Sequence, residues 1–178
     1  MTTMGRLVVF NILRFIALIL LQVVLFKNIG YYNITSPFPY ILIIFLLPIG
    51  ISNFVLYLLA FFTGLTVDAF YDSIGVHAAA CVVLAWFRIF FYRITLEVEV
   101  RESFETPTWH EMGFKWFSPY IFFGCLAHHF ILFLVEVFSF KNFHFTLIST
   151  LLSSIFTFLI ILLISLLFYQ RKSRFNNK

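Results

Sequence analysis

Long apolar runs divide almost the whole sequence and limit the folds that it can adopt. The first run, residues 7–26, is long enough for a helix to cross the hydrocarbon core of a membrane, which takes about 20 helical residues. Further apolar runs follow at residues 40–51, 54–70, 76–91, 119–138 and 145–169. With 62% hydrophobic and 11% charged residues, the chain is far more apolar than a soluble domain. We therefore expect a single-domain, all-α integral membrane protein with six transmembrane helices.

The second and third runs are separated by a turn. Pro48 and Gly50 interrupt the second run, and Ser52-Asn53 follows it. Two short helices therefore fit better than one helix of about 30 residues, which would overshoot the membrane. A re-entrant hairpin is the alternative. The first run has no small-residue cleavage site after it, which favours a retained helix over a signal peptide.

The distribution of Lys and Arg predicts the orientation. An inside amino terminus leaves only Lys27 and Lys141 outside, whereas nine basic residues face the cytoplasm. These nine are Arg6, Arg88, Arg93, Arg101, Lys115, Arg171, Lys172, Arg174 and Lys178. Both termini are therefore expected in the cytoplasm, and the net charge of +4 needs no nucleic-acid partner. Arg14 lies within the first run, where its side chain is expected to snorkel inward, with pairing to an acid as the alternative.

Residues 93–115 form the only long polar region and are expected to be a cytoplasmic loop. This region holds most of the acids in the chain. Residues 94–101 suggest a short strand or extended arm, with a helical extension of the fourth run as the alternative. Trp109 and Trp116 are placed as interfacial anchors for the return to the bilayer.

An acidic face precedes the fourth run. Ala60, Gly64, Asp68 and Asp72 follow one another at intervals of four and therefore share one side of a helix. An unpaired acid at bilayer depth costs several kcal/mol, so Asp68 is expected to meet protein instead of lipid. Small residues such as Gly64 let another backbone come close. We therefore interpret this face as a surface for packing and partner recognition.

The predicted topology gathers other polar residues in the outer half of the membrane. Besides Asp68 and Asp72, this half holds two histidines, His77 and His144, and the outer end of the fifth run. That run carries small and polar residues at multiples of four, namely Gly124, His128 and Glu136. One interpretation is a metal site or a proton relay, because Asp, Glu and His are suitable ligands.

The second interpretation of these residues is structural. In it, these residues form hydrogen bonds between helices, and Asp72 and Ser73 cap the start of the fourth run. A tight turn that includes Gly75 joins the third run to the fourth. The sequence lacks an HExxH motif and a paired-cysteine motif, and His128 and His129 are adjacent and point different ways. It also offers no nucleophile with an adjacent base and no Gly-rich phosphate loop. The structural interpretation is favoured, with no enzyme activity, cofactor or metal.

Two short motifs flank this turn. Gly64-Leu65-Thr66-Val67-Asp68 closes the third run, and Ile74-Gly75-Val76-His77-Ala78 opens the fourth. With the prolines Pro37, Pro39 and Pro48 around the second run, they resemble the rod shape-determining protein MreD family. That family typically shows Gly-Leu-x-x-Asp in its third helix and Leu-Gly-x-His/Asn-Ala at the start of its fourth. The charged loop is longer than in the compact members of the family.

The resemblance implies a non-enzymatic scaffold subunit of the bacterial cell-elongation complex, which directs peptidoglycan synthesis and rod shape. The protein would lie in the inner membrane, contact lipid and bind MreC, with the actin-like MreB, the glycosyltransferase RodA and its penicillin-binding transpeptidase as further partners. The fold would be similar to the six-helix substrate-binding subunits of energy-coupling-factor transporters. One alternative is such a vitamin-binding subunit, although the first run offers only Ala17 as a small docking residue. A membrane enzyme or small exporter is another.

Overall fold

Five long helices build the molecule. The computed structural model describes residues 3–29, 35–137 and 143–168. In this part of the chain, five helices are long and apolar enough to cross a membrane. They are α1 (Thr3–Leu21, continued by the π-helical η1, Gln22–Phe26), α3 (Asn53–Tyr71), α4 (Val76–Thr95), α7 (Phe114–Val137) and α8 (Phe143–Leu167). The predicted all-α, multi-pass membrane class is confirmed.

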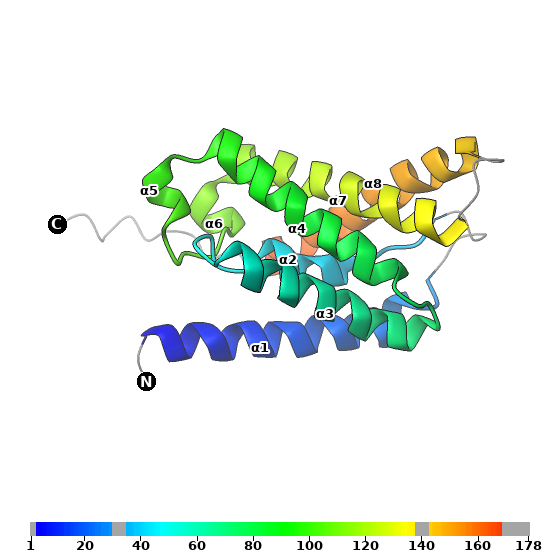
Figure 1. Cartoon of the computed structure of the whole chain (residues 1–178), viewed down its shortest axis with the longest axis horizontal. Coiled ribbons are helices and arrows are strands. Elements are labelled where there is room, and N and C mark those ends of the chain that lie inside the picture. The colour runs from blue at the N-terminus through cyan, green and yellow to red at the C-terminus, as the bar shows by residue number, and fades with distance from the viewer. Residues whose placement is uncertain (1–2, 30–34, 138–142, 169–178) are drawn as a thin grey trace.

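The long helices lie roughly parallel to one long axis (Figure 1). The largest helix interfaces join α3 to α4, α4 to α7 and α7 to α8, so helices that follow one another in this order are neighbours. Helix α1 lies along one side and begins at the end of the molecule that carries the short helices α5 (Val98–Arg101) and α6 (Trp109–Met112) (Figure 1).

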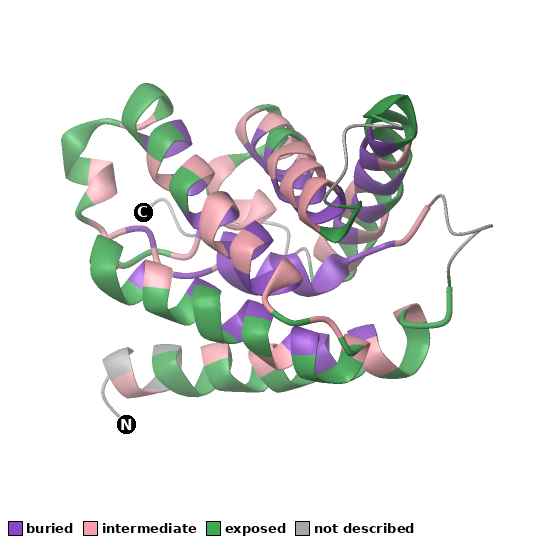
Figure 2. Cartoon of the chain, turned by 45° about the vertical axis from the view of Figure 1, so that its right-hand side comes forward, coloured by how far each residue is buried: buried purple, intermediate pink, exposed green. Residues whose placement is uncertain are grey.

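A segment that is only partly helical runs through the middle of the bundle. This central segment, residues 35–52, contains the 3₁₀ turn η2 (Pro39–Ile41) and one turn of α-helix, α2 (Leu42–Phe45). It crosses the molecule in the direction opposite to α1 (Figure 1), and in Figure 2 its ribbon is mostly buried. Residues 40–51 were expected to form a second transmembrane helix, but regular helix is confined to their first half.

Prolines explain why the central segment is not a long helix. Pro37 precedes its helical turns, Pro39 begins the first of them, and Pro48 follows them. A proline has no N–H to donate, and it disfavours the α conformation of the residue before it. Non-helical backbone is tolerated at membrane depth only where protein or water satisfies its polar groups. The neighbouring helices provide such groups.

The first half of the central segment donates its N–H groups to polar side chains of α1–η1 and α8. The pairs are Ser36 N to Ser153 Oγ at 3.0 Å, Phe38 N to Thr157 Oγ1 at 3.0 Å and Tyr40 N to Gln22 Oε1 at 3.4 Å. The buried Gln22 side chain also donates through Nε2 to the Pro37 carbonyl at 3.2 Å. Polar residues inside apolar helices therefore replace the missing helical hydrogen bonds.

The second half of the segment accepts hydrogen bonds through its carbonyl groups. The bonds are Tyr120 OH to Phe45 O at 3.2 Å, Arg14 Nη1 to Leu46 O at 2.9 Å, and Arg88 Nη2 to Leu47 O at 2.5 Å and to Pro48 O at 2.8 Å. Arg14 also donates to Asn11 Oδ1 at 3.2 Å, so its partners here are a carbonyl and an amide and not the acid of the alternative expectation.

The long helices match their predicted runs closely, and the polar loop does not. Helix α4 continues to Thr95 and α5 follows at Val98–Arg101, so the strand expected at 94–101 is wrong and the helical alternative is nearer. The loop is also tied to the central segment, since Ile49 N donates to Glu105 O at 2.9 Å and Gly50 N to Ser103 O at 2.6 Å. Residues 138 and 169, two predicted helix ends, lie outside the described residues.

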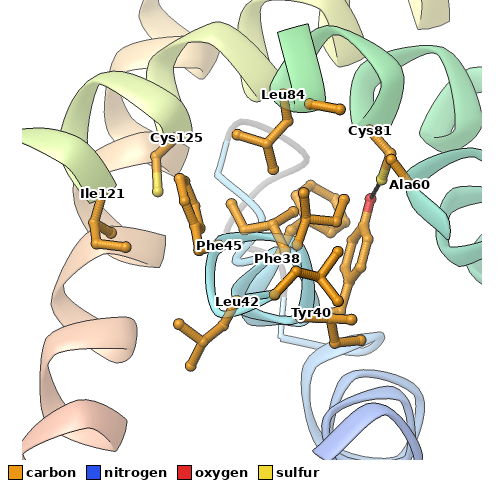
Figure 3. Close-up of a cluster of buried hydrophobic side chains, with 14 of the residues drawn as sticks. Phe38, Tyr40, Leu42, Phe45, Ala60, Cys81, Leu84, Ile121 and Cys125 are labelled. Atoms are coloured by element: carbon orange, nitrogen blue, oxygen red, sulfur yellow. Dashed lines mark hydrogen bonds between the residues drawn. The ribbon is translucent and has the colours of Figure 1, made fainter. Parts of the chain in front are cut away.

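Side chains of the central segment fill the core. Figure 3 shows Phe38, Tyr40, Leu42 and Phe45 surrounded by residues of the long helices, among them the labelled Leu84, Ile121 and Cys125. Only glycine fits at position 124 of α7, because the Phe45 ring occupies the space that a Cβ would take. Both cysteines, Cys81 and Cys125, are buried free thiols.

Candidate functional site

The carboxylate of Asp68 holds the start of α4. Its Oδ1 accepts from Ser73 Oγ at 2.7 Å and from His77 N at 3.0 Å, and its Oδ2 accepts from Ala78 N at 3.0 Å. The first N–H groups of a helix lack intrahelical acceptors, and a carboxylate there is also favoured by the helix dipole. Asp68, which is 3% exposed, therefore joins α3 to α4 within one chain.

This arrangement corrects the predicted cap. Asp72 and Ser73 were expected to cap the fourth helix, but the residue at the cap position is Gly75, which makes no side-chain bond. Asp72 instead ends α3 in the left-handed region with φ 54°, and Gly75 has φ 82°. These two left-handed residues reverse the chain over a short distance, which brings the His77 and Ala78 N–H groups back to Asp68.

Gly64 lies at a close contact between α3 and α4. A Cβ at this position would lie 2.5 Å from the His77 carbonyl oxygen and 2.6 Å from the Ala78 nitrogen. Ala60 is fully buried on the same side of α3. The small-residue face predicted from the sequence therefore packs against α4 of the same chain.

Tyr40 of the central segment connects two histidines. Its hydroxyl lies 3.0 Å from His77 Nδ1 and 2.9 Å from His128 Nε2, with Cys81 Sγ at 3.5 Å, a contact drawn in Figure 3. One hydroxyl has one proton to donate. One histidine must therefore accept from Tyr40 while the other donates to it, so the three side chains form a directional chain of hydrogen bonds.

His129 makes a separate set of bonds. Its Nδ1 lies 2.8 Å from the Cys125 carbonyl, and its Nε2 lies 3.1 Å from Thr157 Oγ1, which also accepts from Phe38 N. His128 and His129 are both fully buried and point to different partners, as their adjacency predicts. The His128 Nδ1 atom has no hydrogen-bond partner among the described residues.

The structure brings together five of the eight predicted site residues. Gly64, Asp68 and His77 meet at the α3–α4 contact, and Gly124 and His128 face the central segment from α7. The other three lie elsewhere: Asp72 and Glu136 are exposed, and Gly75 lies in the turn.

Several residues of this polar core were missed at the sequence level. Tyr40, Gln22 and Thr157 are buried and hydrogen-bonded, but each is a single polar residue within an apolar run. Burying a polar group without a partner in a membrane is costly, so a single polar residue within an apolar run could have indicated a hydrogen-bonded position. Gln22 additionally lies at the start of a π-helical turn, a feature that is frequent at functional sites and that side-chain pattern alone does not reveal.

The donor set does not suit a metal ion. Within the described ranges, no group of three or more His, Cys, Asp or Glu side chains is arranged to hold one. Both carboxylate oxygens of Asp68 accept hydrogen bonds from α4 and Ser73. His77 and His129 also form hydrogen bonds to the protein through their ring nitrogens. This chemistry joins helices to one another.

Comparisons with models of protein families, with curated proteins and with solved structures give no match for this chain.

A zinc chelator is expected to leave the melting temperature of the detergent-solubilised protein unchanged. The reason is that the buried imidazoles are engaged by Tyr40, Thr157 and a backbone carbonyl. Melting is followed by tryptophan fluorescence with and without the chelator, and zinc is added back as the control. A large decrease that added zinc reverses would contradict this structural interpretation.

Replacing Tyr40 with phenylalanine is expected to destabilise the protein by about 1–2 kcal/mol. The change removes the hydroxyl that His77 and His128 share and leaves buried ring nitrogens without a partner. Thermal melting in detergent measures the effect. Tyr57→Phe, at a half-buried tyrosine on α3, is the matched control and should melt like the unaltered protein. Equal melting of the two variants would show that the hydrogen-bond chain contributes nothing.

Proposed function

We propose that this protein is a non-enzymatic scaffold subunit of the bacterial cell-elongation complex, of the MreD type. The proposal begins from the motif between Gly64 and Ala78, which carries the resemblance to that family. The observation that supports it best is the role of Asp68, whose carboxylate takes three donors from the chain itself. The motif acts here as a clamp between two helices, which is what a rigid membrane scaffold requires.

Six passages through the membrane complete the proposal. The five long helices would make five of them. The central segment, a partly helical stretch inside the bundle, would make the sixth. An even number of passages leaves both ends of the chain on the same side. A six-pass arrangement of this kind would be similar to the substrate-binding subunits of energy-coupling-factor transporters.

The proposed orientation places α5 and α6 in the cytoplasm. Arg88, Arg93 and Arg101 lie near the end of the molecule that carries these short helices, whereas Lys27 lies at the far end of α1 and η1 (Figure 1). Basic residues favour the cytoplasmic side of a membrane. An inner-membrane protein with cytoplasmic termini fits this distribution.

Partner helices would dock on the exposed apolar faces. Large apolar side chains are exposed along α1 at Val8, Ile12, Ile16 and Leu20, a stripe with a spacing of four. Such a stripe suits contact with lipid or with a transmembrane helix of MreC, RodA or the transpeptidase. MreB would reach only the cytoplasmic face.

Affinity purification from the native membrane tests the proposal. The tagged full-length protein is extracted in a mild detergent, and a second six-pass membrane protein with the same tag is the control. We expect an MreC-like protein to co-purify selectively, and depletion of the chain to turn rod-shaped cells round. Unchanged cell shape and no selective partner would overturn the proposal. A retained vitamin in native mass spectra would favour the transporter alternative.

A further inference from the structure

We infer that the cytoplasmic end of the bundle contains a binding site for a phosphate group, made by Arg88, Arg93 and Arg101. The three arginines line one cavity of about 210 Å³ between α4, α5 and the end of the central segment. The volume is far above the roughly 10–15 Å³ that a single water requires. We call this cavity the arginine pocket.

The charge of the arginine pocket is not balanced within the chain. All eight acidic side chains lie among the described residues, yet none comes within 4.0 Å of the guanidinium groups of Arg88, Arg93 or Arg101. Glu97, Glu99 and Glu102 of the same region are exposed to solvent. A buried charge without a counter-ion is costly, so the pocket attracts an anion from outside the chain.

Arg88 is the buried base of the pocket. It is 1% exposed, and its Nε donates to Tyr92 OH at 3.1 Å while Nη2 binds the carbonyls of Leu47 and Pro48. These neutral acceptors fix the side chain in place but supply no negative charge. The protein engages Nε and Nη2, so Nη1 is the group of Arg88 left to donate to a phosphate oxygen.

Arg101 and the start of α3 point to the same anion. Arg101 lines the pocket, and its buried Nε atom has no hydrogen-bond partner among the described residues. Asn53, the first residue of α3, lines the pocket, which therefore lies at the positive end of a 19-residue helix. A phosphate group in the pocket is favoured at this positive end of the helix.

The depth of the pocket suits a phosphate at the membrane surface. Arg88 and Arg93 lie in the last two turns of α4, and Arg93 is exposed at the rim. Basic pockets between transmembrane helices on the cytoplasmic side bind anionic headgroups. The phosphate could belong to a lipid headgroup or be free in solution, and the experiment separates the two sources.

Lipid binding to the full-length protein tests the site. The protein is transferred to nanodiscs of phosphatidylcholine, whose phosphate is neutralised by its own choline cation, alone or in an equal mixture with the anionic phosphatidylglycerol. Its melting and its retained lipids in native mass spectra are measured. We expect phosphatidylglycerol to raise the melting temperature and to be retained selectively. If inorganic phosphate in pure phosphatidylcholine gives the same increase, the ligand is free phosphate.

Variants that each remove one positive charge, inside or outside the pocket, show whether the pocket binds the phosphate. Arg101→Gln and Arg93→Gln should each weaken binding about fivefold, the effect of one basic residue near an anionic surface. Lys115→Gln removes an exposed charge outside the pocket and should leave binding unchanged. Each variant must melt like the unaltered protein in pure phosphatidylcholine. The proposal would be overturned if Lys115→Gln weakened binding as much as the pocket variants, or if neither phosphatidylglycerol nor inorganic phosphate raised the melting temperature. It would also be overturned if the pocket variants lost only an acidic partner protein and bound phosphate as before.

Discussion

Replacing Asp68 with leucine is expected to destabilise the protein by about 3 kcal/mol, the largest effect of any single carboxylate in the chain. The change removes the acceptor for Ser73 Oγ and for the N–H groups of His77 and Ala78. A lost helix cap costs about 0.5–2 kcal/mol, and each buried donor left without an acceptor costs about 1–3 kcal/mol. Thermal melting of the purified protein in detergent measures the loss.

Two further variants show whether the loss comes from the Asp68 carboxylate itself. Asp68→Asn keeps one acceptor oxygen but turns an NH₂ group toward a backbone N–H, so its stability should lie between those of the leucine variant and the unaltered protein. Asp72→Asn removes the neighbouring, exposed carboxylate at a left-handed position that asparagine also adopts readily, and should change little. If Asp72→Asn and Asp68→Leu cost the same, the carboxylate of Asp68 does not hold α4.

Replacing Gly64 with alanine is expected to cost about 2–3 kcal/mol, although only one methyl group is added. Its Cβ would lie 2.5 Å from the His77 carbonyl oxygen and 2.6 Å from the Ala78 nitrogen, both backbone atoms that cannot rotate away. Overpacking of this kind typically costs about 1–3 kcal/mol, and here it also separates Asp68 from its partners. Melting and resistance to proteolysis both report the change.

Gly75 provides the comparison for Gly64. Among the described residues, no atom apart from Gly75 and its two chain neighbours lies within 4 Å of a Cβ built at Gly75. However, its φ of 82° disfavours side chains other than asparagine and aspartate. Gly75→Asn should therefore cost less than about 1 kcal/mol. A loss as large as that of Gly64→Ala would mean that the turn, and not the close contact of the helices, limits stability.

The long helices could be predicted because the membrane requires their length and apolar character. Helix α3 was expected at 54–70 and lies at Asn53–Tyr71, with Ser52 as its cap. The central segment could not be predicted in the same way, because an apolar run such as residues 40–51 reads alike whether lipid or protein surrounds it. Pro48 and Gly50 indicated a break, but not that Arg14 and Arg88 would satisfy the exposed carbonyls.

Residues of the candidate site were predicted more reliably than their contacts. The acid at Asp68 and the glycine at Gly64 were identified from their spacing and from the cost of charge at membrane depth. Which carboxylate caps α4 depends on the left-handed conformation of Asp72, which no side-chain pattern specifies. Tyr40 is one of 8 tyrosines in a chain with 27 phenylalanines, and its importance rests on two histidines that are 37 and 88 residues away.

The bonding of the central segment also constrains how the protein is made. Ser36 and Phe38 are synthesised early, yet their acceptors Ser153 and Thr157 follow 117 and 119 residues later. During synthesis these backbone groups have no place in lipid, because no partner exists for them yet. The segment must therefore wait at the membrane surface, or in the shelter of the insertion machinery, until α8 has entered. Insertion of α8 thus decides when the middle of the protein can close.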